Sequence, residues 1–447
     1  MTSALSAAQV DALAPDAAAA AAGKKLASAR SWKGLGQSER ALWGECQGSA
    51  LYHTRVSLVD LACKCSCPSR KFPCKHALGL LYLAAGGAIG AGSEPEWVAE
   101  WVGKRAQTVE KKEAKASARA ATVADPAAQA RRVQKRQETV LAGLDALEAW
   151  LDDLVRNGLA RLEAESPSLW ETQARRLVDA QATGLAARVR RMAGVPGSHP
   201  GWPAQLLDQL GTLTLLLHAY RRLEQLAPEL QHDVRQLVGH TLEQAEVVAH
   251  GDIAEDDWHV LGAVNDDDGR MRMQRTWLRG AASGRAALVL QFAVGGAGFA
   301  ETLVAGTRVR GALAFWPGAL PRRALVHRRD AQQAGVELAP KTTVAAFLAG
   351  HAEALARQPW LESELAVLGG VVPVATAEGS FVVDGEDAAL PLSGKQHRLL
   401  HALAGGQPVD LVGEWNGHRL RPLAAQAEGR FFALGEGAQG EREAAHG

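Results

Sequence analysis

Three cysteines and one histidine in a single twelve-residue stretch constrain this chain more than any other feature of its sequence. The stretch reads Cys65-Ser-Cys67-Pro-Ser-Arg-Lys-Phe-Pro-Cys74-Lys-His76. In an extended segment, residues i and i+2 point to the same side. Cys65 and Cys67 can therefore hold one ion from the end of a strand, while Cys74 and His76 close the site from the other side. Three thiolates and an imidazole are the ligand set of a tetrahedral zinc site.

A site of this kind is predicted to hold one structural Zn²⁺. Four protein ligands fill the tetrahedron and leave no position for a catalytic water. Zinc at such a site contributes on the order of 10 kcal/mol of apparent binding free energy to local folding. The alternative is a group of reduced, buried cysteines with an accidental histidine. Four of the five cysteines lie between residues 63 and 74 of a chain otherwise poor in cysteine, which favours the metal.

The residues that flank the ligands predict the secondary structure of the module. Ala50–Ala62, before the first ligand, is rich in β-forming residues and predicts a strand or hairpin. His76–Ala85, which includes the last ligand, is an apolar run that predicts a helix. A zinc module with strands before the ion and a helix after it is therefore expected at about residues 50–86.

The CxC and CxH pairs resemble those of the SWIM zinc finger. The residues around them share the resemblance, both in Trp43–Ser49 and within Cys67–His76. More of the chain is similar to bacterial SWIM zinc finger family proteins, as in the segments Leu13–Asp16, Trp97–Trp101 and Leu177–Gln181. The resemblance implies a SWIM-type ββα zinc module. It implies no catalytic residue, because the family motif supplies none.

The resemblance also implies a class of partner. Members of the family are often encoded beside MoxR-type AAA+ ATPases and von Willebrand factor A proteins. We therefore expect a non-enzymatic zinc-finger adaptor with one of these as its protein partner.

Two further cysteines, Cys63 and Cys46, stand outside the predicted ligand set. Cys63 forms an overlapping CxC pair with Cys65, so it shares the same strand face. The family pattern selects Cys65 and Cys67, and Cys63 stays open as an alternate ligand or a nearby thiol. Cys46 is expected to be a core thiol.

Three cations surround the ligands: Arg70, Lys71 and Lys75. Three thiolates and one Zn²⁺ leave a local charge of −1, so nearby cations are electrostatically favourable and we prefer this interpretation. The alternative is that these side chains contact a phosphate or an acidic partner.

Charge is distributed unevenly along a chain that is neutral as a whole. Residues 1–136 contain 20 Lys and Arg against 11 Asp and Glu, and residues 137–447 contain 29 against 38. A basic N-terminal part can meet nucleic acid or an acidic partner, or dock on the acidic remainder of its own chain. A DNA- or RNA-binding protein is therefore the first alternative function. The basic stretch 103–136 lacks interleaved aromatic residues, which argues against base stacking.

The remaining composition is that of a soluble, multidomain protein. The 447 residues suffice for two to four domains. No eighteen-residue window is uninterruptedly apolar, so no membrane helix is expected. In the N-terminal run Ala17–Ala22 the basic residues follow the apolar segment, whereas those of a signal peptide precede it. We expect a cytoplasmic location, where reduced thiols suit metal binding.

Hydrophobic patterns divide the chain into segments with different predicted secondary structure. The fold class expected is α+β multidomain, with an N-terminal domain at 1–102 that begins with an Ala-rich helix over 1–30. A basic, Ala-rich linker follows at 103–136, because that stretch has almost no large apolar side chain. Apolar residues at three- and four-residue spacing predict a helical, bundle-like block at 137–250. Strand patterns around one helix, at about Thr342–Arg357, predict a β-rich mixed domain at 251–447.

Catalytic motifs are absent from the sequence. It contains neither G-x-S-x-G nor H-E-x-x-H, and Ser393-Gly-Lys395 lacks the upstream glycine of a phosphate-binding loop. An enzyme with an unrecognised site in the C-terminal domain is the second alternative function.

Overall fold

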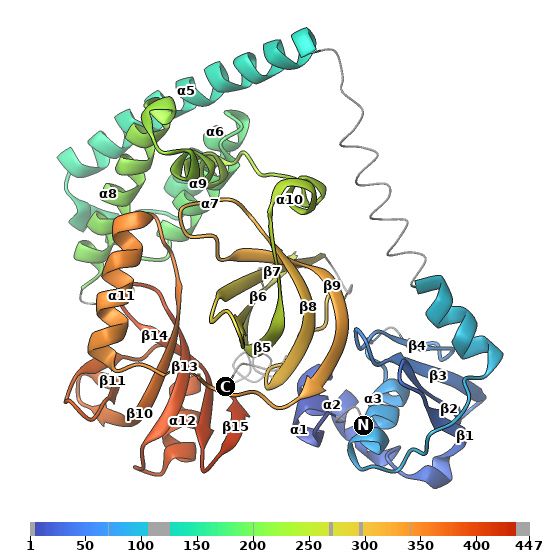
Figure 1. The fold of residues 1–447 in the computed structure, drawn as a ribbon. Coiled ribbons are helices and arrows are strands. Elements are labelled where there is room, and N and C mark those ends of the chain that lie inside the picture. Colours follow the sequence, from blue (N-terminus) through green and yellow to red (C-terminus); the bar gives the residue numbers. More distant parts are fainter. Residues whose placement is uncertain are drawn as a thin grey trace.

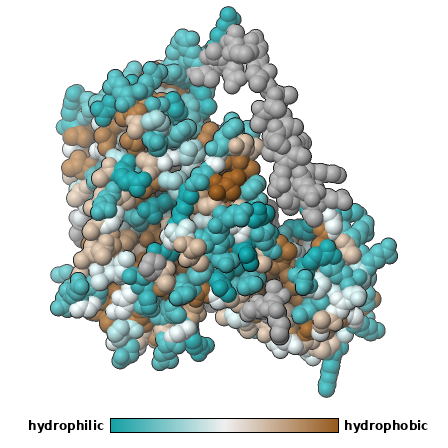
Figure 2. All heavy atoms as spheres, viewed as in Figure 1, coloured by the Kyte–Doolittle hydropathy of each residue, from teal (hydrophilic) through white to brown (hydrophobic). Residues whose placement is uncertain are grey.

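The structure is a computed structural model that describes residues 5–69, 71–105, 126–199, 201–267, 271–294, 298–339 and 341–434. Figure 1 shows four folded parts: an N-terminal module, a helical bundle, a closed β-barrel and a C-terminal sheet. The predicted α+β architecture is confirmed. Hydrophilic side chains cover most of the face seen in Figure 2, and apolar side chains appear on it in scattered patches.

The N-terminal module combines two short helices, an antiparallel sheet and a third helix. Its elements are α1 (Ala7–Leu13), α2 (Ala17–Lys25), β1 (Trp32–Gln37), β2 (Ala41–Gln47), β3 (Leu51–Ser57), β4 (Cys63–Cys65) and α3 (Lys75–Ala85). The sheet order is β1-β2-β3-β4, so β3, β4 and α3 form the predicted ββα unit. The single helix expected over 1–30 is divided, because Pro15 lacks an N–H and Asp16 caps α2 by accepting from the backbone N–H of Ala19.

A helix through residues 96–105 packs on the outer face of this sheet. Trp97 and Trp101 lie on one side of it, as their four-residue spacing predicts. The Arg55 guanidinium lies over both indole rings, with its carbon 5.0 Å and 5.5 Å from the two ring centroids. These tryptophans therefore hold the helix against β3.

The helical bundle follows, after residues that lie outside the described part of the chain. Its helices are α5 (Pro126–Arg156), α6 (Ser168–Asp179), α7 (Thr183–Met192), α8 (Trp202–Arg221) and α9 (Pro228–Val238), with α10 (Gln244–His250) leading onward. The helical character predicted for 137–250 from apolar spacing is confirmed, and Leu144 and Leu147 of α5 are fully buried in the bundle core. Gly184 allows α7 to approach α9 closely, since a Cβ there would lie 2.2 Å from the carbonyl oxygen of Leu237.

The linker expected at 103–136 overlaps elements that the structure shows as helical. The helix through 96–105 covers its first residues, and α5 begins at Pro126. Only residues 106–125 of that stretch lie outside the described residues. Within the described part of the chain, no helix is both long and apolar enough to cross a bilayer.

A closed five-stranded barrel begins the C-terminal half. Its strands are β5 (Asp252–Asp267), β6 (Met271–Gly280), β7 (Ala286–Val294), β8 (Thr307–Phe315) and β9 (Arg323–Ala334), in the order β5-β6-β7-β9-β8. Strands β5 and β6 pair antiparallel, with Asp267 opposite Arg272. A short parallel pairing, of Leu288 with Arg323 and Val289 with Ala324, closes the barrel.

A six-stranded antiparallel sheet follows the barrel. It comprises β10 (Glu364–Thr376), β11 (Gly379–Val383), β12 (Ala389–Pro391), β13 (Val409–Trp415), β14 (Leu420–Ala427) and β15 (Arg430–Ala433), with helices α11 (Val344–Arg357) and α12 (Gln396–Ala404). The sheet order is β12-β11-β10-β13-β14-β15. A shared apolar cluster joins it to the barrel, and there the Trp277 indole N–H donates to the Glu414 carboxylate over 2.7 Å.

The N-terminal module contacts the barrel directly. The Gln9 side-chain amide donates to the carbonyl oxygen of Gly306 over 3.0 Å, and Val304 is buried in the core of the module. Figure 1 shows the module beside the barrel on the side opposite the C-terminal sheet. The zinc module is thus docked on its own chain.

Candidate metal centre

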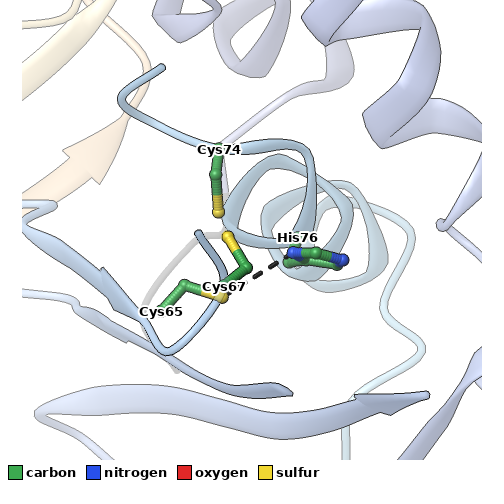
Figure 3. Close-up of side chains that lie close together, drawn as sticks. All are labelled: Cys65, Cys67, Cys74 and His76. Atoms are coloured by element: carbon green, nitrogen blue, oxygen red, sulfur yellow. Dashed lines mark hydrogen bonds between the residues drawn. The ribbon is translucent and has the colours of Figure 1, made fainter. Parts of the chain in front are cut away.

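The four predicted ligands come together at one point of the N-terminal module. Cys65 ends β4, Cys67 follows it, Cys74 is the N-cap residue of α3, and His76 lies in the first turn of that helix. Figure 3 shows the three sulfur atoms and the imidazole ring converging from the strand end and the helix start. Their ligand atoms all lie within 4.8 Å of one another.

These distances suit a zinc ion. A tetrahedron with Zn–S bonds of about 2.3 Å has sulfur–sulfur edges of about 3.8 Å. With a Zn–N bond of about 2.0 Å, the sulfur–nitrogen edge is about 3.5 Å, and Nδ1 of His76 lies 3.7 Å from Sγ of Cys65, close to that value. Cys74 and His76 are only 5% and 4% exposed, so water has little access from the helix side. The residues present therefore fit one structural Zn²⁺ with no open coordination position.

Thr54 and Tyr52 support the ligands from strand β3. Thr54 pairs with Cys65 in the β3–β4 ladder, and its hydroxyl lies 3.2 Å from the Cys65 sulfur. The Tyr52 ring packs against the His76 imidazole with the ring centroids 4.9 Å apart. Such contacts orient the ligands of a metal. The sequence did not reveal these residues, because identifying them requires the strand register.

Hydrogen bonding within the cluster shifts the pKa values of two of its thiols in opposite directions. A bond from the Cys74 thiol, the largest influence, lowers the pKa of the Cys65 thiol, and further bonds from His76 and Thr54 lower it despite burial. The same bond to Cys65, together with burial, raises the pKa of Cys74. Zinc would displace the protons that these ligands still carry.

Cys63 lies outside the cluster. It is 8% exposed, and its thiol donates to the carbonyl oxygen of Leu61 over 3.4 Å. Burial raises the pKa of the Cys63 thiol to about 12. The structure thus places Cys63 as a neighbouring thiol. Cys46 is fully buried in the module core, as expected.

The predicted cations near the site have different surroundings. The Lys71 ammonium donates to the Asp16 carboxylate over 2.6 Å, which ties the ligand loop to the start of α2. Lys75 is exposed at the start of α3. Arg70 lies outside the described residues.

Comparison with known proteins identifies two segments of the chain. Residues 52–85 match the model of the SWIM zinc finger, and residues 135–238 match that of the SWIM-associated four-helix bundle domain. The first segment contains all four ligands, and the second spans most of α5 through α9. No curated protein and no solved structure matches the chain. The chain therefore carries a SWIM zinc finger and the bundle domain associated with it.

Proposed function

We propose that this chain is a non-catalytic adaptor in which one zinc ion maintains a folded surface for a protein partner. The supporting observation is the closed Cys65, Cys67, Cys74 and His76 cluster, in which four protein ligands leave the ion no position for a substrate. The ion's contribution would be to fix α3 against the strand end. The protein would act in the cytoplasm, where thiols stay reduced.

The loop between the ligand pairs is the part of the module best suited to contact a partner. Phe72 is 54% exposed there, although large aromatic side chains are usually buried. Exposed aromatic side chains are frequent anchors at protein interfaces. Zinc would hold this loop at both ends, so partner binding should depend on the metal.

The proposed partner is a MoxR-type AAA+ ATPase or a von Willebrand factor A protein, on the strength of the family resemblance. Each candidate from the same genome can be purified and titrated against the zinc-loaded full chain by biolayer interferometry. We expect one of them to bind, and Cys74→Ser to weaken binding at least about tenfold. Cys63→Ser is the matched control and should bind like the parent. Equal binding by Cys74→Ser and the parent would refute a zinc-dependent surface.

Nucleic-acid binding is the second candidate function. Lys33 and Lys75 are exposed on the module, and neither forms an ion pair with a carboxylate among the described residues. A fluorescence titration of single- and double-stranded oligonucleotides at several salt concentrations separates the two functions. A steep fall of log K with log salt would favour nucleic acid. An absence of oligonucleotide binding at low salt would leave protein-partner binding as the proposed function.

A further inference from the structure

A cavity of about 550 Å³ lies where the helical bundle, the barrel and the C-terminal sheet meet. Asp233 of α9 contributes to its wall from the bundle, Trp316 from the connection between β8 and β9, Arg323 from the start of β9, and Arg421 from strand β14. Cavities of this size commonly hold small molecules, and they occur preferentially at domain interfaces. The cavity is remote in sequence from the zinc ligands.

Arginine dominates the charge of the cavity wall. Its lining includes six arginines and three carboxylates, namely Arg191, Arg275, Arg322, Arg323, Arg419, Arg421, Asp233, Glu362 and Glu414. Three of the arginines are paired with acids. Arg191 binds Glu362 through two hydrogen bonds of 2.8 Å and 2.7 Å, Arg275 binds Glu414, and Arg322 binds Glu364.

The other three arginines have no carboxylate partner among the described residues. The Arg323 guanidinium lies over the Trp316 ring, 4.2 Å from its centroid, and its Nε atom is buried without a hydrogen-bond partner. The Arg419 guanidinium donates to the carbonyl oxygen of Leu392 over 3.3 Å. Arg421 is half-buried, and no acid of the described chain pairs with it. Guanidinium groups held in this way are suited to bind phosphate or carboxylate oxygens.

The carboxylates of the wall are already occupied by protein groups. Asp233 accepts the backbone N–H of Ala319 over 2.8 Å and the Gln358 amide over 3.0 Å. Glu414 accepts from Trp277 and Arg275. Arg323, Arg419 and Arg421 therefore pair with no carboxylate, and against them stands one carboxylate of the wall, Asp233, whose hydrogen-bond donors are neutral.

Aromatic and apolar groups form the rest of the wall. Trp316 and Trp360 line the cavity, each is 5% exposed, and neither indole N–H has a hydrogen-bond partner. Leu288, Leu290 and Leu320 add apolar surface.

We propose that this cavity binds a small organic phosphate monoester, with its dianionic phosphate on the unpaired arginines and an aromatic ring on the tryptophan and leucine wall. Two negative charges match the excess of guanidinium groups better than one does. The volume exceeds what a bare phosphate ion fills, which leaves room for an organic part against the apolar wall. This binding site is independent of the zinc module and of the adaptor function.

Isothermal titration calorimetry of the zinc-loaded full chain tests the proposal. The probes are AMP, GMP, CMP, UMP and phenyl phosphate, with inorganic phosphate and adenosine as partial ligands. At least one monoester should bind at least about tenfold more tightly than either partial ligand. Arg323→Gln and Arg421→Gln should each weaken its binding about tenfold or more, since each removes a charge-assisted contact. Arg323→Lys, which keeps the charge, should weaken it less than Arg323→Gln.

Arg156→Gln is the matched control, because Arg156 is 75% exposed on α5, away from the cavity lining. It should bind the monoester like the parent. Circular dichroism verifies the fold of each variant, and if Arg323→Gln does not fold, Arg421→Gln decides. No binding of any monoester at millimolar concentration overturns the proposal, as does binding that neither cavity variant weakens. Equally tight binding of inorganic phosphate overturns the role of the apolar wall.

Discussion

Nδ1 of His76 lies 3.7 Å from Sγ of Cys65, so a helix and a strand end that are eleven residues apart in the chain meet at a common point. A single zinc ion bound there would join β4 to α3. Helix α3 is almost completely buried, so its docking determines the core of the N-terminal module. The zinc site is thus expected to control the folding of this part of the chain.

Cys74→Ser should unfold the zinc module and leave the helical bundle intact. The substitution removes one of four ligands and the structural contribution of the ion, on the order of 10 kcal/mol. Limited proteolysis followed by mass spectrometry should show new cleavage between residues 45 and 85, while α5–α9 stay protected. Cys63→Ser, which changes a thiol outside the cluster, should keep the parent pattern. Parental resistance of the Cys74→Ser module would contradict this prediction.

Leu144→Ala should destabilise the helical bundle by about 2–5 kcal/mol, because it leaves a cavity in a close-packed core. Leu144 is 0% exposed at the centre of the bundle. Urea unfolding, monitored by proteolytic cleavage within the bundle, measures the loss of stability. Leu207→Ala is the control, since Leu207 is 54% exposed on α8 and should change stability little. Equal losses of stability from Leu144→Ala and Leu207→Ala would contradict the burial of Leu144 in the bundle core.

Asp233 should make stability depend on pH. Burial raises the pKa of this carboxyl to about 6, above its ordinary 3.8. The native state therefore binds more protons than the unfolded state between these values, so this group's contribution to stability falls as pH rises from about 4 to about 6. Asp233→Asn removes this dependence. The free energy of unfolding of Asp233→Asn minus that of the parent should therefore be larger at pH 7.5 than at pH 5, by roughly 1–3 kcal/mol.

Urea unfolding of parent and Asp233→Asn at both pH values measures this difference, and the comparison cancels the contributions of other groups. Asp208→Asn is the control, because Asp208 is 65% exposed. A difference between parent and Asp233→Asn that does not change with pH would contradict the raised pKa.

Replacing residues 106–125 by a Gly/Ser segment of equal length should leave both flanking parts folded. The helix through 96–105 is held by Arg55, and α5 begins at Pro126, so neither depends on the intervening composition. Zinc content and thermal unfolding should match the parent. The same replacement extended to residue 136 serves as the contrast, because it removes the first turns of α5 and should lower bundle stability. Precipitation or early melting of the shorter replacement would show that residues 106–125 do more than connect.

The sequence predicted those features that depend on local patterns. The ligand spacing identified Cys65, Cys67, Cys74 and His76, and the three- and four-residue spacing of apolar residues at 137–250 identified the helical block. Both signals arise from residues that are close in the chain, where strand and helix geometry fix the relative directions of side chains.

Features that depend on distant pairing were not predicted. Barrel closure relies on Leu288 and Val289 meeting Arg323 and Ala324, and short parallel pairing has no local signature. The contact of Thr54 with Cys65 requires the strand register. Arg323 and Arg421 reach one cavity from the barrel and the sheet, so no spacing in the sequence connects them.

Elemental analysis of the purified, freshly prepared full chain tests the zinc account most directly. We expect one zinc ion per chain in the parent and in Cys63→Ser, and less than one tenth of that in Cys74→Ser. A parent protein that is folded in residues 45–85 without stoichiometric zinc would contradict the account, and so would zinc binding that requires Cys63 in place of Cys74.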